Sequence, residues 1–411
     1  MVIEAIVEAL EPKQALFGRL AGIVGAGAIL ATKTSSLSVT AIAAGVPGPE
    51  RVAGLHFFNP VQLMRLVEVI PGLRTAPAVI DRLVALVEGA GHVPVRAADS
   101  PGFLAHHAGR GLHTEGLAIL REGVASPAQI DTVMREAAGF RLGPFELFDL
   151  TGLDVSFPVT RLIHEQFWHD PRLRPTHMPA NRVSGGLLGR KTAEGFHAYG
   201  PDGRIRRPAP PPVPDVAPVA AVATDPDLAE ALGLPTLSAG EVAPTGALIL
   251  TAPVGEEATT HATRLGLEAR RVLAVDLLFG PGGHRTAMTT PVTRPDMRDA
   301  AHALLAHGGQ GVTMIHDSPG FVAQRILATI VNIACEIAQM RLATPADIDR
   351  AVTLGLGYPE GPLALGDRLG PARLHRILTA MQAVTGDPRY RPSLWLRRRA
   401  MLGASLLTPE G

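Results

Sequence analysis

The pentapeptide DSPGF occurs twice in this chain, at residues 99–103 and again at residues 317–321. The same spacing persists without a gap along the segments that follow, where it pairs Asp131 with Asp349. Solenoid repeats have periods of roughly 20–50 residues, so a period this long indicates a duplicated domain. The sequence therefore predicts two helical domains of similar length, one in each half of the chain.

Local signals predict helices inside each copy. The Ser-Pro pair of DSPGF predicts a helix start, with Ser as the cap and Pro at the first helical position. A second start is predicted at Ser126 in SPAQIDTVM and at Thr344 in TPADIDRAV, where a hydroxyl can cap the helix and Pro again follows. Both copies are therefore expected to be all-α.

The segment upstream of the first helical copy shows an α/β pattern. Short apolar runs alternate with two amphipathic stretches, which predicts a largely parallel, doubly wound sheet. The expected strands are residues 2–7, 28–32, 52–58, 66–70 and 93–97, and the expected helices are residues 11–24 and 77–91.

A looser α/β pattern precedes the second helical copy. GALILT at Gly246 echoes GAILAT at Gly27, and the proline-rich stretch RRPAPPPVPDVAP before this region is typical of a stiff linker. The expected division is residues 1–98 (α/β), 99–200 (helical), 201–218 (linker), 219–316 (degenerate α/β) and 317–411 (helical).

Composition narrows the class of protein. The formal net charge is zero and 18% of the residues are charged, so nothing favours nucleic acid or an anionic membrane surface as a partner. No apolar run approaches the roughly 18 residues of a membrane span. The single cysteine, Cys335, excludes an internal disulfide framework and is expected to be a buried thiol. The spacing of the histidines predicts no metal site, and the interpretation is a soluble, cytoplasmic protein.

Four polar residues follow or interrupt the apolar runs of the first α/β region: Ser35, His56, Asn59 and Glu68. Functional groups gather at the carboxyl ends of parallel strands, so these side chains are expected to meet there. A histidine oriented by a carboxylate is a general-base arrangement, and Ser and Asn can hold a substrate oxygen. A structural role remains the alternative, because a histidine at a strand end is often only a satisfied buried residue.

The stretch LHFFNPVQLMRLVEV, preceded by ILATKTSSLSVTAIA and followed by DSPGF, resembles the 3-hydroxyacyl-CoA dehydrogenase family, and so does GRKTAEGFHAYG at Gly189. The duplicated helical domain is similar to that of the longer bacterial members that act on 3-hydroxybutyryl-CoA or 3-hydroxyadipyl-CoA. The resemblance implies a Rossmann-type NAD-binding domain, helical C-terminal domains like those of 6-phosphogluconate dehydrogenase, NAD as the cofactor and an acyl-CoA substrate.

The resemblance also implies roles for individual residues. His56 is expected to take the proton of the 3-hydroxyl while hydride passes from C3 to NAD, and Glu68 is expected to orient it. Ser35 and Asn59 are expected to line the pocket around the reacting oxygen and the nicotinamide. His106 stands where the family usually has an Asn that supports the catalytic histidine. The other residues expected at the cofactor are Ala5, Ile6, Glu8, Lys13 and Lys191.

One departure concerns the start of the chain. In the family, the segment corresponding to MVIEAIVEAL follows a strand, a glycine-rich phosphate turn and a helix, so the resemblance implies a partial Rossmann domain. The glycines of GAGAIL at Gly25 precede a strand and do not replace that turn. The hypothesis is a truncated product or a misplaced start, whose open, apolar sheet edge would pair with a second copy or a complementing chain.

Two other functions remain open at this point. A catalytically inactive structural or partner-binding module is the main alternative, and acyl-CoA binding without redox chemistry is another. In the second α/β region, Asp276 stands at the position of His56, so no second active site is expected there.

Overall fold

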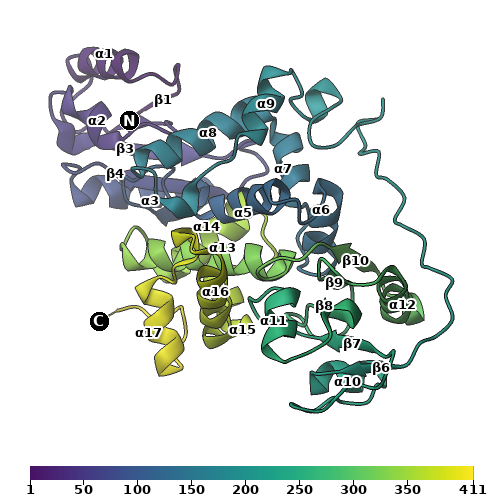
Figure 1. Cartoon of the computed structure of the whole chain (residues 1–411). Helices are drawn as coiled ribbons and strands as arrows, with labels where there is room; N and C mark the ends of the chain where they lie inside the picture. The colour runs from purple at the N-terminus through teal and green to yellow at the C-terminus, as the bar shows by residue number, and fades with distance from the viewer. Residues whose placement is uncertain (411) are drawn as a thin grey trace.

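The computed structural model describes residues 1–410 and contains two five-stranded sheets, each followed along the chain by a helical region (Figure 1). In the first sheet β3 and β4 are antiparallel and all other neighbours are parallel. Its strands, in hydrogen-bonded order, are β1 (Val2–Glu4), β2 (Leu30–Thr32), β3 (Val52–Phe57), β4 (Leu66–Pro71) and β5 (Val93–Arg96). The helices between them are α1 (Leu10–Ala21), α2 (Val39–Ala44) and α3 (Pro77–Gly89).

The expected strands and helices of this first region are confirmed, with two differences. The first strand ends at Glu4, where the Glu4 carboxylate accepts a hydrogen bond of 2.6 Å from the N–H of Ile6 and the chain turns. Helix α2 was not predicted. The Ser38 hydroxyl caps it, and the Asp99 carboxylate accepts from the N–H groups of Val39 and Thr40.

The first helical region begins later than predicted. Its helices are α4 (Ala105–Ala108), α5 (Arg110–Arg121), α6 (Pro127–Glu136), α7 (Pro144–Thr151), α8 (Leu153–Gln166) and α9 (Met178–Ser184). The prediction that Ser100 caps a helix beginning at Pro101 is wrong, because residues 101–104 form turns and Leu104 precedes the helix. The cap at Ser126 is confirmed, since its hydroxyl accepts from the N–H of Gln129.

The second half repeats the arrangement. Its sheet has the order β10-β9-β8-β7-β6, with β8 and β9 antiparallel. The strands are β6 (Ala221–Ala223), β7 (Leu248–Thr251), β8 (Val272–Val275), β9 (Arg285–Thr289) and β10 (Val312–Ile315). The helices are α10 (Pro226–Leu232), α11 (Ala258–Arg264), α12 (Pro295–Leu305), α13 (Val322–Gln339), α14 (Pro345–Leu356), α15 (Pro362–Leu369), α16 (Pro371–Thr385) and α17 (Leu394–Leu402).

Aspartates 218 residues apart in the sequence make the same kind of contact in both halves of the chain. Asp131 accepts hydrogen bonds from the first N–H groups of α7, and Asp349 accepts from those of α15. Asp99 binds the N-terminus of α2 as Asp317 binds that of α11. Each carboxylate satisfies N–H groups that a helix leaves unpaired, which explains why an acid is needed at these positions.

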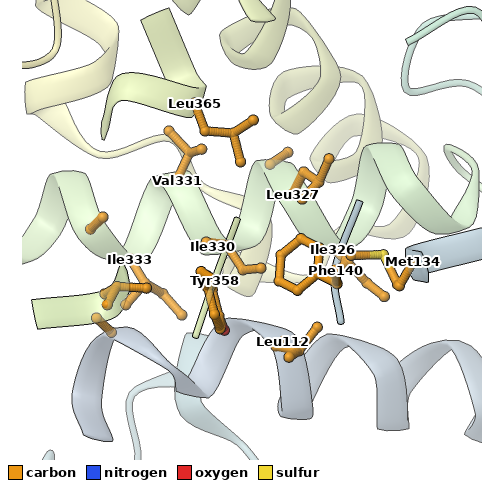
Figure 2. Close-up of a cluster of buried hydrophobic side chains, with 14 of the residues drawn as sticks. Leu112, Met134, Phe140, Ile326, Leu327, Ile330, Val331, Ile333, Tyr358 and Leu365 are labelled. Atoms are coloured by element: carbon orange, nitrogen blue, oxygen red, sulfur yellow. The ribbon is translucent and has the colours of Figure 1, made fainter. Parts of the chain in front are cut away.

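The two helical regions share one hydrophobic core. Helix α5 packs along α13, and Figure 2 shows Leu112 facing Ile326 and Ile330 across this contact. Cys335 on α13 is buried as expected, and burial raises the pKa of its thiol. Because the core crosses from one half of the chain to the other, neither helical region buries its apolar face alone.

The proline-rich stretch at residues 206–218 contains no helix or strand and joins the first helical region to the second sheet (Figure 1). Within residues 1–410 none of the helices has both the length and the apolar character to cross a bilayer.

Candidate active site

His56 and Glu68 meet because their strands pair antiparallel. The register of β3 and β4 sets the two residues directly opposite each other, and His56 Nδ1 lies 2.6 Å from Glu68 Oε2. Both side chains are buried. The expectation that Glu68 lies near a carboxyl strand end is wrong, since it occupies the middle of β4, and the antiparallel register is what brings it to His56.

The second oxygen of Glu68 holds the helix that follows. Oε1 accepts hydrogen bonds from the N–H groups of Leu104 and Ala105, at 3.1 and 2.8 Å. The carboxylate therefore joins β3, β4 and the start of α4. With Nδ1 donating to Glu68, the lone pair of His56 Nε2 remains available to accept a proton, which is the geometry of an oriented general base.

His106, on α4, is the second histidine of the site. Its ring centroid is 5.4 Å from that of His56, and the Phe58 ring lies 4.7 Å from that of His56 and 5.6 Å from that of His106. Burial, together with the nearby charges of His56 and Arg110, lowers the pKa of His106 well below its ordinary value. His106 Nδ1 is buried without a hydrogen-bond partner among the described residues. The His106 ring is therefore a neutral imidazole beside the rings of His56 and Phe58.

Ser35 lies in the loop after β2, and Glu8 organises that loop. The Glu8 carboxylate accepts from the Thr34 hydroxyl at 2.6 Å and from the N–H groups of Ser35 and Ser36 at 2.9 and 3.0 Å. Burial alone would raise the pKa of Glu8, but these hydrogen bonds and the charge of Lys13 hold it below its ordinary value. Glu8 is therefore ionised and fixes the backbone on which the Ser35 side chain sits.

Lys13 neutralises the carboxylates at this edge of the sheet. Its ammonium is fully buried and pairs with Glu4 at 2.7 Å and with Glu8 at 3.4 Å. Ala5 and Ile6, between these acids, are exposed. Five of the residues expected at the cofactor thus lie around the carboxyl ends of β1 and β2, on the same sheet as the His56–Glu68 pair: Ala5, Ile6, Glu8, Lys13 and Ser35.

Two expected residues lie apart from these groups. Asn59 is exposed immediately after Phe58. Lys191 belongs to the first helical region, where its ammonium pairs with Asp154 at 2.5 Å. The roles expected for Asn59 and Lys191 stay predictions.

The structure also brings in residues that sequence reasoning missed. Arg110 is buried one helical turn beyond His106, and its position at i+4 on the same predicted helix was the available signal. A cleft of about 470 Å³ runs between the loop after β2 and helix α8. Its lining includes Ser36, Asp99 and Trp168.

The second sheet holds no corresponding pair. Asp276, which follows β8, accepts a hydrogen bond of 2.9 Å from Gln324 Nε2 and another from the N–H of Leu278. Burial raises the pKa of this carboxyl. Its partners are a neutral amide and a backbone group, so the arrangement offers no oriented base.

The chemistry of the site fits one end of a dinucleotide. A general base beside a strand end lies where the nicotinamide ring of a dinucleotide would bind. The diphosphate of a dinucleotide is usually held elsewhere, by a glycine-rich turn between a strand and a helix. The connections from β1 to α1 and from β2 to α2 contain no glycine, and Gly25 and Gly27 lie between α1 and β2 as expected. Among residues 1–410 no three His, Cys, Asp or Glu side chains are grouped to hold a metal ion.

Comparison with known protein families finds matches in both halves of the chain. The 3-hydroxyacyl-CoA dehydrogenase NAD binding domain matches residues 1–100, and the C-terminal domain of the same family matches residues 102–199 and 320–405. The chain belongs to the 3-hydroxyacyl-CoA dehydrogenase family. The hypothesis of a truncated NAD-binding domain is not supported, because the model of that domain matches residues 1–100.

Individual members of the 3-hydroxyacyl-CoA dehydrogenase family are similar over different lengths. The chain is 40% identical over 404 residues to the 3-hydroxyadipyl-CoA dehydrogenase of Escherichia coli (strain K12), covering 98% of this chain and 81% of the relative. It is 40% identical over 199 residues to the mitochondrial hydroxyacyl-coenzyme A dehydrogenase of Rattus norvegicus, spanning 63% of that relative. The crystal structure of a 3-hydroxybutyryl-CoA dehydrogenase from Escherichia coli K12 matches 97% of this chain and 81% of that chain, with a TM-score of 0.84 and 37% identity.

Proposed function

We propose that this chain is an NAD-dependent 3-hydroxyacyl-CoA dehydrogenase that oxidises the 3-hydroxyl of an acyl-CoA thioester to a 3-ketone. The observation that carries the proposal is the buried His56–Glu68 pair, joined at 2.6 Å across β3 and β4 in a domain that matches the family's NAD-binding domain. An oriented base at a sheet of this kind is what removal of a hydroxyl proton requires.

In the proposed reaction His56 Nε2 accepts the proton of the 3-hydroxyl. The C3–O bond becomes a double bond as hydride leaves C3, and the chemistry that a bound NAD would supply is that of a hydride acceptor. Glu68 accepts the hydrogen bond of His56 Nδ1 and stabilises the imidazolium that forms. Because Glu68 also binds the first N–H groups of α4, it fixes the base relative to the helical region that closes over the sheet.

The residues around the pair are assigned supporting roles. His106, neutral and unpartnered at Nδ1, is proposed to hydrogen-bond the substrate oxygen. Ser35 and Asn59 are proposed to bind the substrate oxygen and the nicotinamide side. The residues proposed to contact the cofactor elsewhere are Ala5, Ile6, Glu8, Lys13 and Lys191.

The assignment of domains is also a proposal. We infer that residues 99–200 and 317–411 are two copies of one helical unit, each preceded by an α/β unit, with residues 201–218 as the linker. The matched aspartate caps at equivalent positions of the two copies support it, as does the match of one family domain to both segments. The second α/β unit, without a His-Glu pair, contributes packing and no catalysis.

A partner at the edge of the first sheet is proposed as well. Among residues 1–410 strand β1 pairs only with β2, and Ile3, Ile6 and Val7 around it are exposed. The edge of β6 in the second sheet is covered, because Ala223 bridges Thr236 in parallel. We infer that β1 pairs with a strand from a second copy of this chain.

The competing function is an inactive, partner-binding member of the family, which the absence of a glycine-rich turn after β1 and after β2 favours. Oxidation of NADH with acetoacetyl-CoA, followed at 340 nm, separates the two. Active protein whose rate falls by about 10²–10⁴-fold in His56→Ala supports the dehydrogenase. Absence of turnover and of NADH binding in the purified chain would contradict it and leave the partner-binding function.

A further inference from the structure

Trp168 presents an exposed indole ring to the cleft between α8 and the loop after β2. It follows the end of α8, lines the cleft and is 90% exposed, whereas the other tryptophan of the chain, Trp395, is buried. Tryptophan carries a large apolar ring that a folded protein normally packs against other groups. An indole left open in a cleft is therefore available to a ligand.

The backbone that carries this ring has an unusual conformation. Trp168 has a φ of 51° and His169 a φ of 64°, so two consecutive residues with side chains lie in the left-handed region. That region is unfavourable for residues with a Cβ atom. The turn is nevertheless held, since the N–H of Trp168 donates to the carbonyl of Glu165 at 3.1 Å and the N–H of His169 donates to that of His164 at 2.9 Å. Strained backbone of this kind is found mainly at functional sites.

The second half of the chain makes the corresponding turn without an aromatic residue. DPRLRP at residues 170–175 matches DPRYRP at residues 387–392, and this alignment sets Trp168 against Thr385 and His169 against Gly386. Gly386 has a φ of 65°, so the second copy places a glycine where the first has a strained histidine. The fold itself therefore does not require the indole, which occurs only in the half that contains the His-Glu pair.

The cleft suits an uncharged, apolar ligand. Its volume of about 470 Å³ lies within the roughly 300–1,000 Å³ that is usual for small-molecule sites. The residues that line it include no Lys or Arg, which the phosphates of CoA or of NAD would need as partners. A hydrocarbon chain needs only apolar surface. Such surface is provided by Leu37, Pro101, Leu162 and Trp168.

The cleft lies beside the candidate base. Pro101 lines it, and Phe103, two residues further along the same turn, has its ring centroid 5.7 Å from that of His56. On the opposite wall Ser36 follows Ser35, the residue proposed to bind the reacting oxygen. An acyl chain whose C3 lies at His56 can therefore extend its later carbons into the cleft.

We propose that Trp168 binds the hydrocarbon part of the acyl chain, so that the protein favours chains long enough to reach the indole over four-carbon chains. Trp168 is in this account a specificity-determining residue. The oxidation step rests on the proposed function, whereas contact between an acyl chain and the indole is a property of binding alone.

The kinetic test compares acetoacetyl-CoA with 3-ketooctanoyl-CoA in the oxidation of NADH by the full-length chain. We expect kcat/KM to favour the eight-carbon substrate by at least about fivefold, because its extra methylenes lie on apolar surface. In Trp168→Ala this ratio should fall by at least about threefold, and Trp168→Phe, which keeps an aromatic ring, should retain most of it. Val242→Ala, at a 92% exposed position in the second half of the chain, is the control and should keep the wild-type ratio.

Quenching of tryptophan fluorescence by acrylamide tests binding without turnover. Because Trp395 is buried, the quenchable emission comes from Trp168. The unreactive thioester octanoyl-CoA should lower the quenching constant by about twofold, since a chain lying on one face of the ring leaves only the other face open. Butyryl-CoA should protect less, and CoA or NAD alone should give no protection.

The two measurements separate this inference from the proposed function. Protection by octanoyl-CoA in a chain that turns over neither substrate would leave the acyl-binding surface standing while the dehydrogenase proposal fails. Equal kcat/KM for the two substrates in the wild type, or a preference unchanged in Trp168→Ala, would overturn the role of Trp168. So would the absence of protection by octanoyl-CoA, or equal protection by CoA or NAD alone, which would assign the indole to another part of the ligands.

Discussion

At the scale of single residues, Glu68 has the most consequential set of contacts. One oxygen holds the His56 ring and the other holds the N–H groups of Leu104 and Ala105. The same carboxylate therefore determines the tautomer of the base and the position of the helix that carries His106. A substitution of Glu68 can separate its contact with His56 from its contact with α4, because the two contacts use different oxygens.

Glu68→Gln should abolish turnover while leaving the fold intact. An amide can keep its oxygen toward α4, but its nitrogen would then donate to His56 Nδ1 and leave the proton on Nε2, where the base is needed. We expect kcat to fall by about 10³–10⁴-fold, with little change in Tm. Kinetics at 340 nm and thermal unfolding check both parts, and a variant with wild-type kcat would contradict this role of Glu68.

Sequence reasoning found this pair but not Arg110. The family resemblance pointed to His56 and Glu68 directly, although it did not indicate that an antiparallel register aligns them. Arg110 differs because its importance lies in what surrounds it. The spacing of four residues from His106 was a local signal, but the hydrogen bond to Thr160 of α8, 50 residues along the chain, could not be predicted from it.

At the scale of helices and strands, local chemistry predicted most of the elements and failed where a cap comes from a distance. Apolar runs predicted the strands, and the Ser126 cap acts on the helix beside it. The cap predicted at Ser100 is wrong, and the neighbouring Asp99 binds the N-terminus of α2, which lies much earlier in the chain. The sequence can identify a residue that is able to cap a helix, but it does not identify the helix that this residue caps.

Asp131, which caps α7 from α6, should make stability depend on pH. Burial raises its pKa to about 6, although hydrogen bonds from His197 and the N–H of Phe145 act in the opposite direction. The folded state thus holds this proton more tightly than the unfolded chain, so Asp131 stabilises the fold below about pH 4 and loses that contribution as pH rises to about 6.

Urea unfolding at pH 4, 5 and 6 measures this effect. Asp131 contributes a fall of up to about 1.4 kcal/mol in the free energy of unfolding per pH unit in that window. Asp131→Asn cannot titrate, so its free energy of unfolding should be lower overall but fall less steeply with pH. Asp227→Asn, at an exposed position, is the matched control. An identical slope in wild type and Asp131→Asn would refute the assignment.

At the scale of the whole molecule, buried ion pairs join the two halves of the chain in addition to the shared apolar core. Arg325 on α13 pairs at 2.7 Å with Glu115 on α5 and at 2.7 Å with Glu122 just beyond it, and donates to the Tyr390 hydroxyl at 2.8 Å. Burial alone would lower the pKa of Arg325, but its electrostatic interactions with Glu115, Tyr390 and Glu122 raise it above its ordinary value. The guanidinium therefore stays charged in the interior.

Arg325→Met should destabilise the molecule strongly, because it leaves Glu115 buried without its main partner. We expect a loss of about 3–5 kcal/mol in the free energy of unfolding. The double variant Arg325→Met with Glu115→Leu should recover part of that loss, since both charges are then absent. Denaturant unfolding measures all three proteins, and a double variant less stable than the single one would contradict this explanation.

Phe140 and Tyr358 stand 218 residues apart, at the same spacing as the two copies of DSPGF, and their rings meet edge to face with centroids 4.9 Å apart. If the two positions belonged to two identical chains, both would hold the same residue. A hydroxyl on one ring would then also be present on the other. A tandem chain is free of that restriction. Under the proposed duplication, a single chain allows the two sides of this contact to carry different groups and to evolve independently of each other.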